Sequence, residues 1–415
     1  MIETDKNYWL YIAPHTYCHI KNGQALLYNT QSGVSMETTD EKIILLLQSL
    51  HDRKNLGAIS CNGAMLSQAP YAEFTTEFCQ KEMGNTIDTS LLPEKPVQMM
   101  PMLNLQCDID KLQQDSERNI GEDVLQYLLE LNIYLHSSCN RQCKLCSAYS
   151  KQCLCCQIHP GQPSYLPLTH LENISRQIKH GTIGKLNLAG GTIFEYPYYQ
   201  ELATLLSDFK GQIHIWNHYK NFADCKTFNP DFFYDVVIPS PITDSLENCL
   251  LILNGLKVKY HFYITGTEEY EAAEEAIEKH GMKLYAIHPI YTGNNLSFFE
   301  EYIYTDREDI LQSEISFNEI FAHQKMNTHF FGSLTILPDG STYANVNAPV
   351  VGNIMNDSLL DIINKEMLTN TAWRKTREAA PCSDCLYQLM CPSPSNYEMA
   401  IGKANLCHVK KEILF

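Results

Sequence analysis

The fold of this chain is decided by residues 131–146, which read Leu131-Asn-Ile-Tyr-Leu-His-Ser-Ser-Cys139-Asn-Arg-Gln-Cys143-Lys-Leu-Cys146. Apolar and polar side chains alternate at the start of this stretch, a pattern that predicts a β-strand. Three cysteines then follow within eight residues. Thiols this close together cannot all form unstrained disulfides, whereas three thiolates can bind a cubane iron–sulfur cluster and leave its fourth iron open. A zinc site whose fourth ligand lies elsewhere, or reduced structural thiols, are the alternatives.

Length, charge and hydropathy exclude several classes of protein. The 415 residues are enough for two or three domains, and the net charge of −17 without a run of lysine and arginine argues against nucleic acid as a partner. No apolar run approaches the roughly 20 residues that cross a bilayer, and the first residues lack the pattern of a secretory signal. We therefore expect no membrane contact and a cytoplasmic protein. In that reducing compartment, the 16 cysteines indicate metal sites rather than disulfides.

The first 95 residues predict a small α+β module. Asn22-Gly23 separates two apolar runs, which predicts a tight hairpin because both turn residues need positive φ. Thr38 and Glu41 have the spacing of a capping box at the start of a helix. Residues 96–128 begin rich in Pro, Met and Gln and end in an apolar segment, so we interpret them as a linker with a lead-in helix.

Residues 129–305 predict a regular alternation of six strands and helices, which indicates a parallel sheet with right-handed crossovers. The five strands after the first are expected at residues 185–189, 213–218, 235–239, 260–265 and 284–288. Polar side chains at alternate positions of these strands indicate a ligand cavity, because a closed barrel fills its interior with aliphatic side chains. The expected interior residues are Asn187, His214, Trp216, His218, His261, Tyr263 and Thr265. For each single histidine, a satisfied interior residue is the favoured interpretation over a catalytic one.

Further motifs lie after the second strand and near the C-terminus. Gly190-Gly191-Thr192 ends the second strand, and two glycines there let backbone approach a ligand closely. A hairpin with a Pro338-Asp-Gly340 turn opens the region 306–415. Four later cysteines can close a cubane completely or bind a structural zinc, and they are Cys382, Cys385, Cys391 and Cys407. A third group, Cys153, Cys155 and Cys156, has two readings: a redox or substrate-contacting thiol, or packed thiols beside the first loop.

The first cysteine loop resembles the signature of radical S-adenosylmethionine (SAM) enzymes. The resemblance implies an α/β fold with a partial (β/α)6 barrel at residues 129–305. It also implies a [4Fe-4S] cluster on Cys139, Cys143 and Cys146, and an oxidoreductase that cleaves SAM reductively at the open iron. The family's Gly-Gly-Glu turn, which holds the SAM amino group, corresponds to Gly190, Gly191 and Thr192. The chain departs from the family at Thr192, which replaces the glutamate, and at Leu145, which replaces an aromatic residue.

The C-terminal hairpin, Gly352-Asn-Ile and the four later cysteines resemble the SPASM, or twitch-like, extension of peptide-modifying radical SAM enzymes. The resemblance implies one auxiliary [4Fe-4S] cluster on these cysteines, with zinc as the alternative. Asn345 stands where that extension would have another cysteine. The N-terminal module, residues 1–95, resembles small winged-helix modules that bind the leader of a precursor peptide by strand addition.

Two short runs of sequence resemble a smaller group within this family. Cys385-Leu-Tyr-Gln388 and Asn405-Leu-Cys407-His408 look like the SPASM-containing proteins of GG-Bacteroidales peptide systems, a group with pseudo-radical SAM members. This resemblance implies a ribosomally made precursor peptide (a RiPP) as partner, an electron donor such as flavodoxin or ferredoxin, and a second maturase as a further partner. The leading hypothesis is therefore a radical SAM peptide maturase. The alternative is a catalytically degenerate scaffold that binds the precursor or a partner maturase.

Overall fold

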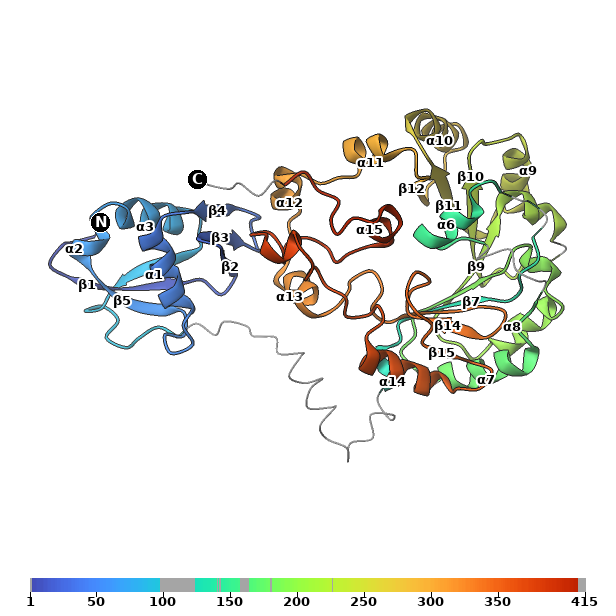
Figure 1. Cartoon of the computed structure of the whole chain (residues 1–415), viewed down its shortest axis with the longest axis horizontal. Helices are drawn as coiled ribbons and strands as arrows, with labels where there is room; N and C mark the ends of the chain where they lie inside the picture. Colours follow the sequence, from blue (N-terminus) through green and yellow to red (C-terminus); the bar gives the residue numbers. More distant parts are fainter. Residues whose placement is uncertain are drawn as a thin grey trace.

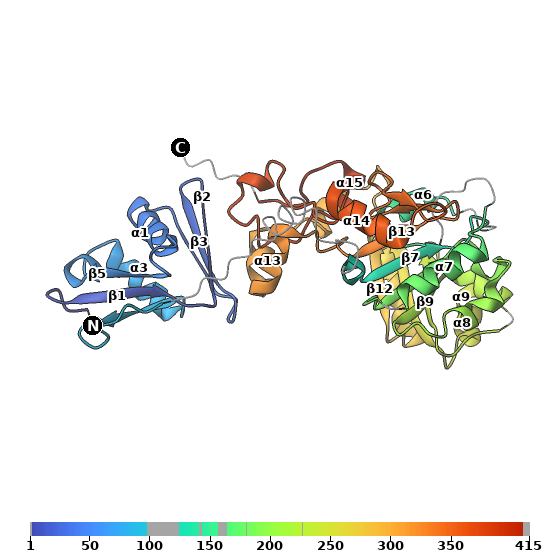
Figure 2. The ribbon, with the colours of Figure 1, turned by 90° about the horizontal axis from the view of Figure 1, so that it is seen from below.

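The structure is a computed structural model that describes residues 2–97, 124–139, 141, 143–156, 164–179, 181–225 and 227–409. An N-terminal module lies at one end of the molecule and a large sheet at the other, with the C-terminal segment between them (Figures 1 and 2). None of the helices in these described parts is long and apolar enough to span a bilayer. Most of the predicted linker, residues 98–123, lies outside the described residues.

Two three-stranded antiparallel sheets build the N-terminal module, in the orders β5-β1-β6 and β2-β3-β4. Its elements are β1 (Asn7–Ile12), β2 (Thr16–Lys21), β3 (Gln24–Asn29), β4 (Ser35–Thr38), α1 (Glu41–His51), β5 (Ala58–Asn62), α2 (Gly63–Leu66), α3 (Tyr71–Gln80) and β6 (Gly84–Asp88). The Asn22-Gly23 hairpin is confirmed, since both residues have positive φ and Lys21 pairs with Gln24. The predicted capping box is wrong. Asp40 caps α1 instead, because its side chain accepts from two backbone N–H groups of the first turn.

A nine-stranded sheet forms the rest of the fold, in the order β12-β11-β10-β9-β8-β7-β13-β14-β15. The first six strands in this order run parallel to one another and are consecutive in the chain, which confirms the predicted alternation. These strands are β7 (Glu130–Tyr134), β8 (Lys185–Ala189), β9 (Gln212–His218), β10 (Phe233–Pro239), β11 (Lys257–Ile264) and β12 (Tyr285–Pro289). Because six strands run in one direction, their carboxyl ends lie along one edge, where α/β proteins place ligand sites.

Helices and short turns connect these strands and cover the sheet (Figure 1). They are η1 (Val124–Tyr127), α6 (Cys146–Gln152), α7 (Leu168–Ile178), η2 (Ile193–Glu195), η3 (Tyr199–Glu201), α8 (Leu202–Leu205), η4 (Tyr219–Asp224), α9 (Ser245–Ile252), α10 (Thr267–His280) and α11 (Leu296–Tyr302). The lead-in segment forms only the short η1. Along α7, Leu171, Ile174 and Ile178 form the buried face.

The C-terminal region continues the same sheet. β13 (Ser333–Ile336) pairs in parallel with β7, and an antiparallel hairpin leads to β14 (Ser341–Tyr343) and β15 (Gly352–Asn353). The remaining elements are α12 (Arg307–Gln312), α13 (Phe317–Lys325), α14 (Leu359–Thr369), η5 (Cys382–Asp384) and α15 (Asn396–Ile401). The predicted hairpin is confirmed, and its turn is held by Asp339, whose carboxylate accepts the N–H of Ser341 at 3.0 Å.

Candidate functional site

The first cysteine loop follows the carboxyl end of β7, and Cys146 begins α6. Burial, together with neighbouring thiols of which Cys155 has the largest effect, raises the pKa of Cys143 to about 11 and that of Cys146 to about 12. The structure therefore brings the three predicted thiols into one partly buried group. Among the described residues, no three His, Cys, Asp or Glu side chains converge tightly enough to hold a single metal ion. A cubane needs less convergence, because each thiolate binds a different iron.

The glycine turn packs directly on this cysteine loop. A Cβ on Gly191 would lie 1.7 Å from the carbonyl oxygen of Ser138, and Gly191 has φ +58°. A Cβ on Gly190 would lie 2.7 Å from the backbone of His136. Glycine is required at both positions because the two loops touch through their backbones. Both glycine N–H groups donate to the carbonyl oxygen of Cys156, at 3.0 and 2.6 Å.

Two buried polar atoms beside this turn lack a partner. Thr192 is 2% exposed, and its Oγ1 has no hydrogen-bond partner among the described residues. The Nδ2 atom of Asn217 is equally unsatisfied within the described chain. Asn221 connects Asn217 to the glycine turn, since its Nδ2 donates to Asn217 Oδ1 at 2.7 Å and to the Gly191 carbonyl oxygen at 3.4 Å. Buried polar atoms normally have partners, so these orphans fit a polar ligand such as the amino-acid end of SAM.

Residues 152–156 pass over the carboxyl ends of the strands. Gln152 exchanges two hydrogen bonds of 2.8 Å with the backbone of Tyr291, and the Tyr134 hydroxyl donates to the Cys155 carbonyl at 2.8 Å. Cys155 and Cys156 are 1% and 4% exposed, and their sulfurs lie 3.8 Å apart. These two thiols are therefore packed beside the first loop. A redox role for them stays a prediction.

A large cavity of about 1880 Å³ opens between the sheet, the C-terminal region and the N-terminal hairpin. Of the seven expected interior residues, His214, Trp216 and His261 line it. The other four do not, and their side chains form hydrogen bonds elsewhere in the fold. His218, for example, accepts the N–H of Lys220 at the start of η4. The cavity exceeds the 300–1,000 Å³ of ordinary small-molecule pockets, so it has room for a peptide segment.

Two further cavity residues, Asp235 and His288, were not singled out by the sequence. Asp235 accepts from His214 Nδ1 at 2.6 Å and from His261 Nε2 at 2.8 Å. His261 Nδ1 lies 2.9 Å from His288 Nε2. Burial alone would raise the pKa of Asp235, but the hydrogen bonds from both histidines outweigh burial and lower the pKa to about 2. No local pattern in the sequence identifies them, because their place in the row follows from strand register, in which Asp235 pairs with Trp216 and His288 with Tyr263.

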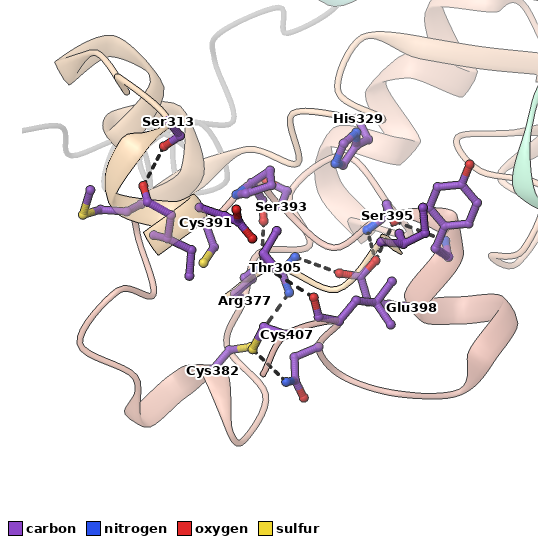
Figure 3. A pocket seen from close by; sticks show the side chains of 18 of the residues that line it. Thr305, Ser313, His329, Arg377, Cys382, Cys391, Ser393, Ser395, Glu398 and Cys407 are labelled. Atoms are coloured by element: carbon purple, nitrogen blue, oxygen red, sulfur yellow. Dashed lines mark hydrogen bonds and ion pairs between the residues drawn. The ribbon is translucent and has the colours of Figure 1, made fainter. Parts of the chain in front are cut away.

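All four C-terminal cysteines line this same cavity. Arg377 donates from Nη1 to Cys382 Sγ at 3.8 Å and from Nη2 to Glu398 Oε1 at 2.7 Å (Figure 3). Asn405 donates to Cys407 Sγ at 3.1 Å. Burial raises the pKa of Cys382, and the guanidinium lowers it. Donors aimed at sulfur stabilise thiolates, so this set fits a thiolate-bound metal centre.

The loop between Cys385 and Cys391 is also the docking surface of the N-terminal module. His19 donates from Nδ1 to the carbonyl oxygen of Leu386 at 2.8 Å, and Lys21 donates to Gln388 Oε1 at 2.8 Å. A buried apolar cluster joins the two regions, and its members are Tyr17, Leu26, Tyr28, Ile310, Ile315, Ile320, Leu386, Tyr387 and Met390. The N-terminal module and the second thiol group therefore share one packed interface.

Comparison with known proteins identifies part of the chain. Residues 328–386 match the SPASM family, described as an iron-sulfur cluster-binding domain. This segment is a SPASM match. It contains the β13–β14 hairpin and the first two cysteines of the later group, and it ends before Cys391. No curated protein matches the chain.

Three solved structures have a similar arrangement. SuiB of Streptococcus suis bound to its precursor peptide SuiA is 12% identical, with a TM-score of 0.47, covering 97% of this chain and 99% of that one. SuiB bound to S-adenosylmethionine gives the same identity and TM-score, with coverage of 95% and 97%. The anSMEcpe structure with bound AdoMet and the Cp18Cys peptide is 13% identical, with a TM-score of 0.43 and coverage of 67% and 96%.

Proposed function

We propose that this protein is a radical SAM enzyme of the SPASM type that modifies a ribosomally made precursor peptide. One observation carries the proposal. Three thiols and a glycine turn pack together at the carboxyl ends of the neighbouring strands β7 and β8, where open α/β sheets bind ligands. The SPASM match supplies independent support for iron–sulfur chemistry. In this proposal the six parallel strands form the partial (β/α)6 barrel of that class.

Cys139, Cys143 and Cys146 would hold a [4Fe-4S] cluster, which when loaded and reduced supplies the electron that cleaves SAM. The chain's own residues would position SAM. Thr192 Oγ1 and Asn217 Nδ2, two buried polar atoms near the glycine turn that have no hydrogen-bond partner among the described residues, would bind its polar end. Gly190 and Gly191 keep the turn close to the cysteine loop. Glu195 follows within the same turn and has partners of its own.

The second thiol group, Cys382, Cys385, Cys391 and Cys407, would hold one auxiliary [4Fe-4S] cluster, with zinc as the alternative. Zinc requires four sulfurs about 2.3 Å from one point, and no described set converges that tightly. Metal analysis of wild type and a Cys382→Ala/Cys385→Ala variant decides between them. Loss of about four irons supports the cluster, loss of one zinc supports the alternative, and no loss refutes both.

The peptide would enter the cavity of about 1880 Å³, with its leader on the N-terminal module, residues 1–95. A cytoplasmic flavodoxin or ferredoxin would donate electrons, and a second maturase would be a further partner. Membership of the GG-Bacteroidales peptide systems belongs to the same proposal.

A non-catalytic scaffold is the second candidate, and a specific observation favours it. The carbonyl oxygen of Cys156 accepts from both glycine N–H groups of the turn, so this chain's own backbone already uses those two donors. Thr192 and Leu145, which depart from the family pattern, point the same way. Equilibrium binding separates the two candidates. SAM affinity that strengthens when the first cluster is present supports the enzyme, whereas precursor binding without SAM binding supports the scaffold.

A further inference from the structure

Four side chains from four neighbouring strands form a hydrogen-bonded row across the cavity wall. The row runs from His214 on β9 to Asp235 on β10, His261 on β11 and His288 on β12, with heavy-atom distances of 2.6, 2.8 and 2.9 Å. The Asp235 and His261 side chains are 2% and 4% exposed, and all four residues line the cavity. Aliphatic side chains would fill this part of the wall at a lower cost in free energy, because burying a carboxylate is costly.

The hydrogen bonds fix where the protons lie. Asp235 is ionised at neutral pH, so it accepts from both imidazoles that contact it. Burial lowers the pKa of His261, so it is neutral and carries its single proton on Nε2, toward Asp235. Its Nδ1 must therefore accept, and the donor is His288 Nε2–H. Burial lowers the pKa of His288 to about 4, so His288 is neutral too, and its Nδ1 has no proton.

The row consequently ends in a lone pair on His288 Nδ1. Charged residues near the row are Asp235, Lys259 of β11 and Lys185 of β8, and Lys185 is paired at 3.6 Å with Glu130, which also lines the cavity. Tyr263 packs edge-on against the His288 ring at 5.3 Å. A base oriented by a second group and backed by a buried carboxylate is the arrangement of acid–base catalysis. Lys259 favours an anion in the same cavity, whereas Glu130 offsets the charge of Lys185.

We propose that His288 is a proton acceptor for the peptide bound in the cavity, positioned by His261 and Asp235. The substrate class is a peptide that brings a weakly acidic O–H, N–H or S–H group to His288. That group gives its proton to Nδ1 and keeps the bonding electron pair as an anion. The proton on His288 Nε2 moves to His261 Nδ1, so the positive charge comes to lie beside the Asp235 carboxylate. This inference rests on the proposed function for its peptide, and no electron is transferred in the step.

The test uses the full chain, reconstituted anaerobically with SAM and dithionite, and synthetic candidate precursor peptides taken from the short open reading frames that flank this gene. Both 5′-deoxyadenosine and modified peptide are measured. For His288→Ala we expect modified peptide to fall roughly 10²- to 10⁴-fold while 5′-deoxyadenosine stays within about twofold. Added imidazole should restore part of the peptide yield in His288→Ala and not in His288→Gln. A merely structural role would not respond to imidazole. His280→Gln, at the end of α10 outside the cavity, is the control and should match wild type.

A second measurement does not depend on the peptide. Nitrogen NMR of the ¹⁵N-histidine-labelled chain, with His288 assigned by its loss in His288→Gln, should show a protonated Nε2 and a bare Nδ1 at pH 7. A proton on Nδ1 overturns the proposal, as does a His288→Ala variant that modifies the peptide at the wild-type rate. Wild type that forms no 5′-deoxyadenosine refutes the proposed function instead, and the NMR result then decides whether His288 can accept a proton.

Discussion

Replacing Arg377 by glutamine should loosen the C-terminal region and weaken its metal site together. The Arg377–Glu398 ion pair has an N–O distance of 2.7 Å, and its side chains are only 11% and 6% exposed. Removing one partner of a buried pair typically costs about 3–5 kcal/mol, because the other charge stays buried alone. Ser395 also donates to Glu398, from both its N–H and its hydroxyl, which partly compensates the carboxylate. We therefore expect the low end, about 3 kcal/mol.

Hydrogen exchange in the metal-free chain measures this locally, which matters because a multidomain protein has no single free energy of unfolding. A loss of about 3 kcal/mol corresponds to amides of α15 that exchange roughly 10²-fold faster. Metal affinity should also fall by about 10- to 100-fold, since Arg377 donates to Cys382 Sγ. Arg176→Gln, on the exposed face of α7, is the matched control.

A double variant separates the two effects of Arg377. Arg377→Met/Glu398→Gln removes both charges and keeps a side-chain oxygen that accepts from Ser395, so protection of α15 should return, whereas metal affinity should stay low because the donor to sulfur is still missing. Exchange of α15 in Arg377→Gln within twofold of wild type would refute the reasoning about the ion pair. Full metal affinity in the double variant would refute the role assigned to the N–H···S contact.

Three further predictions address other parts of the molecule. Burial lowers the pKa of His288 from 6.5 to about 4, so the folded chain favours the neutral imidazole. The contribution of His288 to the free energy of unfolding is complete above pH 6.5, and about 3 kcal/mol of it is lost as the pH falls from 6.5 to 4. Urea unfolding followed at pH 7 and pH 4.5 should show a smaller acid effect in His288→Gln, and an unchanged one would contradict this. Gly191→Ala places a Cβ 1.7 Å from the Ser138 carbonyl, so iron at the first loop should be lost while the second metal is retained, as metal analysis can verify. Tyr387→Phe removes a 2.8 Å hydrogen bond to Glu37 of β4 worth about 1 kcal/mol, so the β3–β4 hairpin should exchange about fivefold faster, and equal rates would argue against the docked interface.

Much of the fold could be predicted from local pattern. Alternation and turn residues located the six parallel strands, and Asn22-Gly23 specified its hairpin because few other residues adopt two positive φ angles in succession. Helix starts were predicted less well. Asp40 caps α1 in place of Thr38 because its carboxylate reaches the first free N–H groups. The α7 helix begins after Pro167, whose conformation needs no side-chain cap.

The site could be predicted only where its residues are close in sequence. Cys139, Cys143 and Cys146 share one loop, so their spacing alone indicated a metal site. The row of Asp235 and His288 depends on register between strands far apart in the chain, which local pattern does not contain. The contact between the N-terminal hairpin and the Cys385–Cys391 loop likewise joins residues more than 350 positions apart. Tertiary packing decides both features.

Reductive cleavage of SAM by the full chain is the most direct test of the central claim. The anaerobically reconstituted protein, incubated with SAM and dithionite, should form 5′-deoxyadenosine, and a Cys146→Ala variant prepared in parallel should form none above background. Retention of the second metal in that variant, shown by metal analysis, would confirm that the loss is local to the first loop. Equal amounts of 5′-deoxyadenosine from wild type and Cys146→Ala, or none from either, would contradict the assignment of this chain as a radical SAM enzyme.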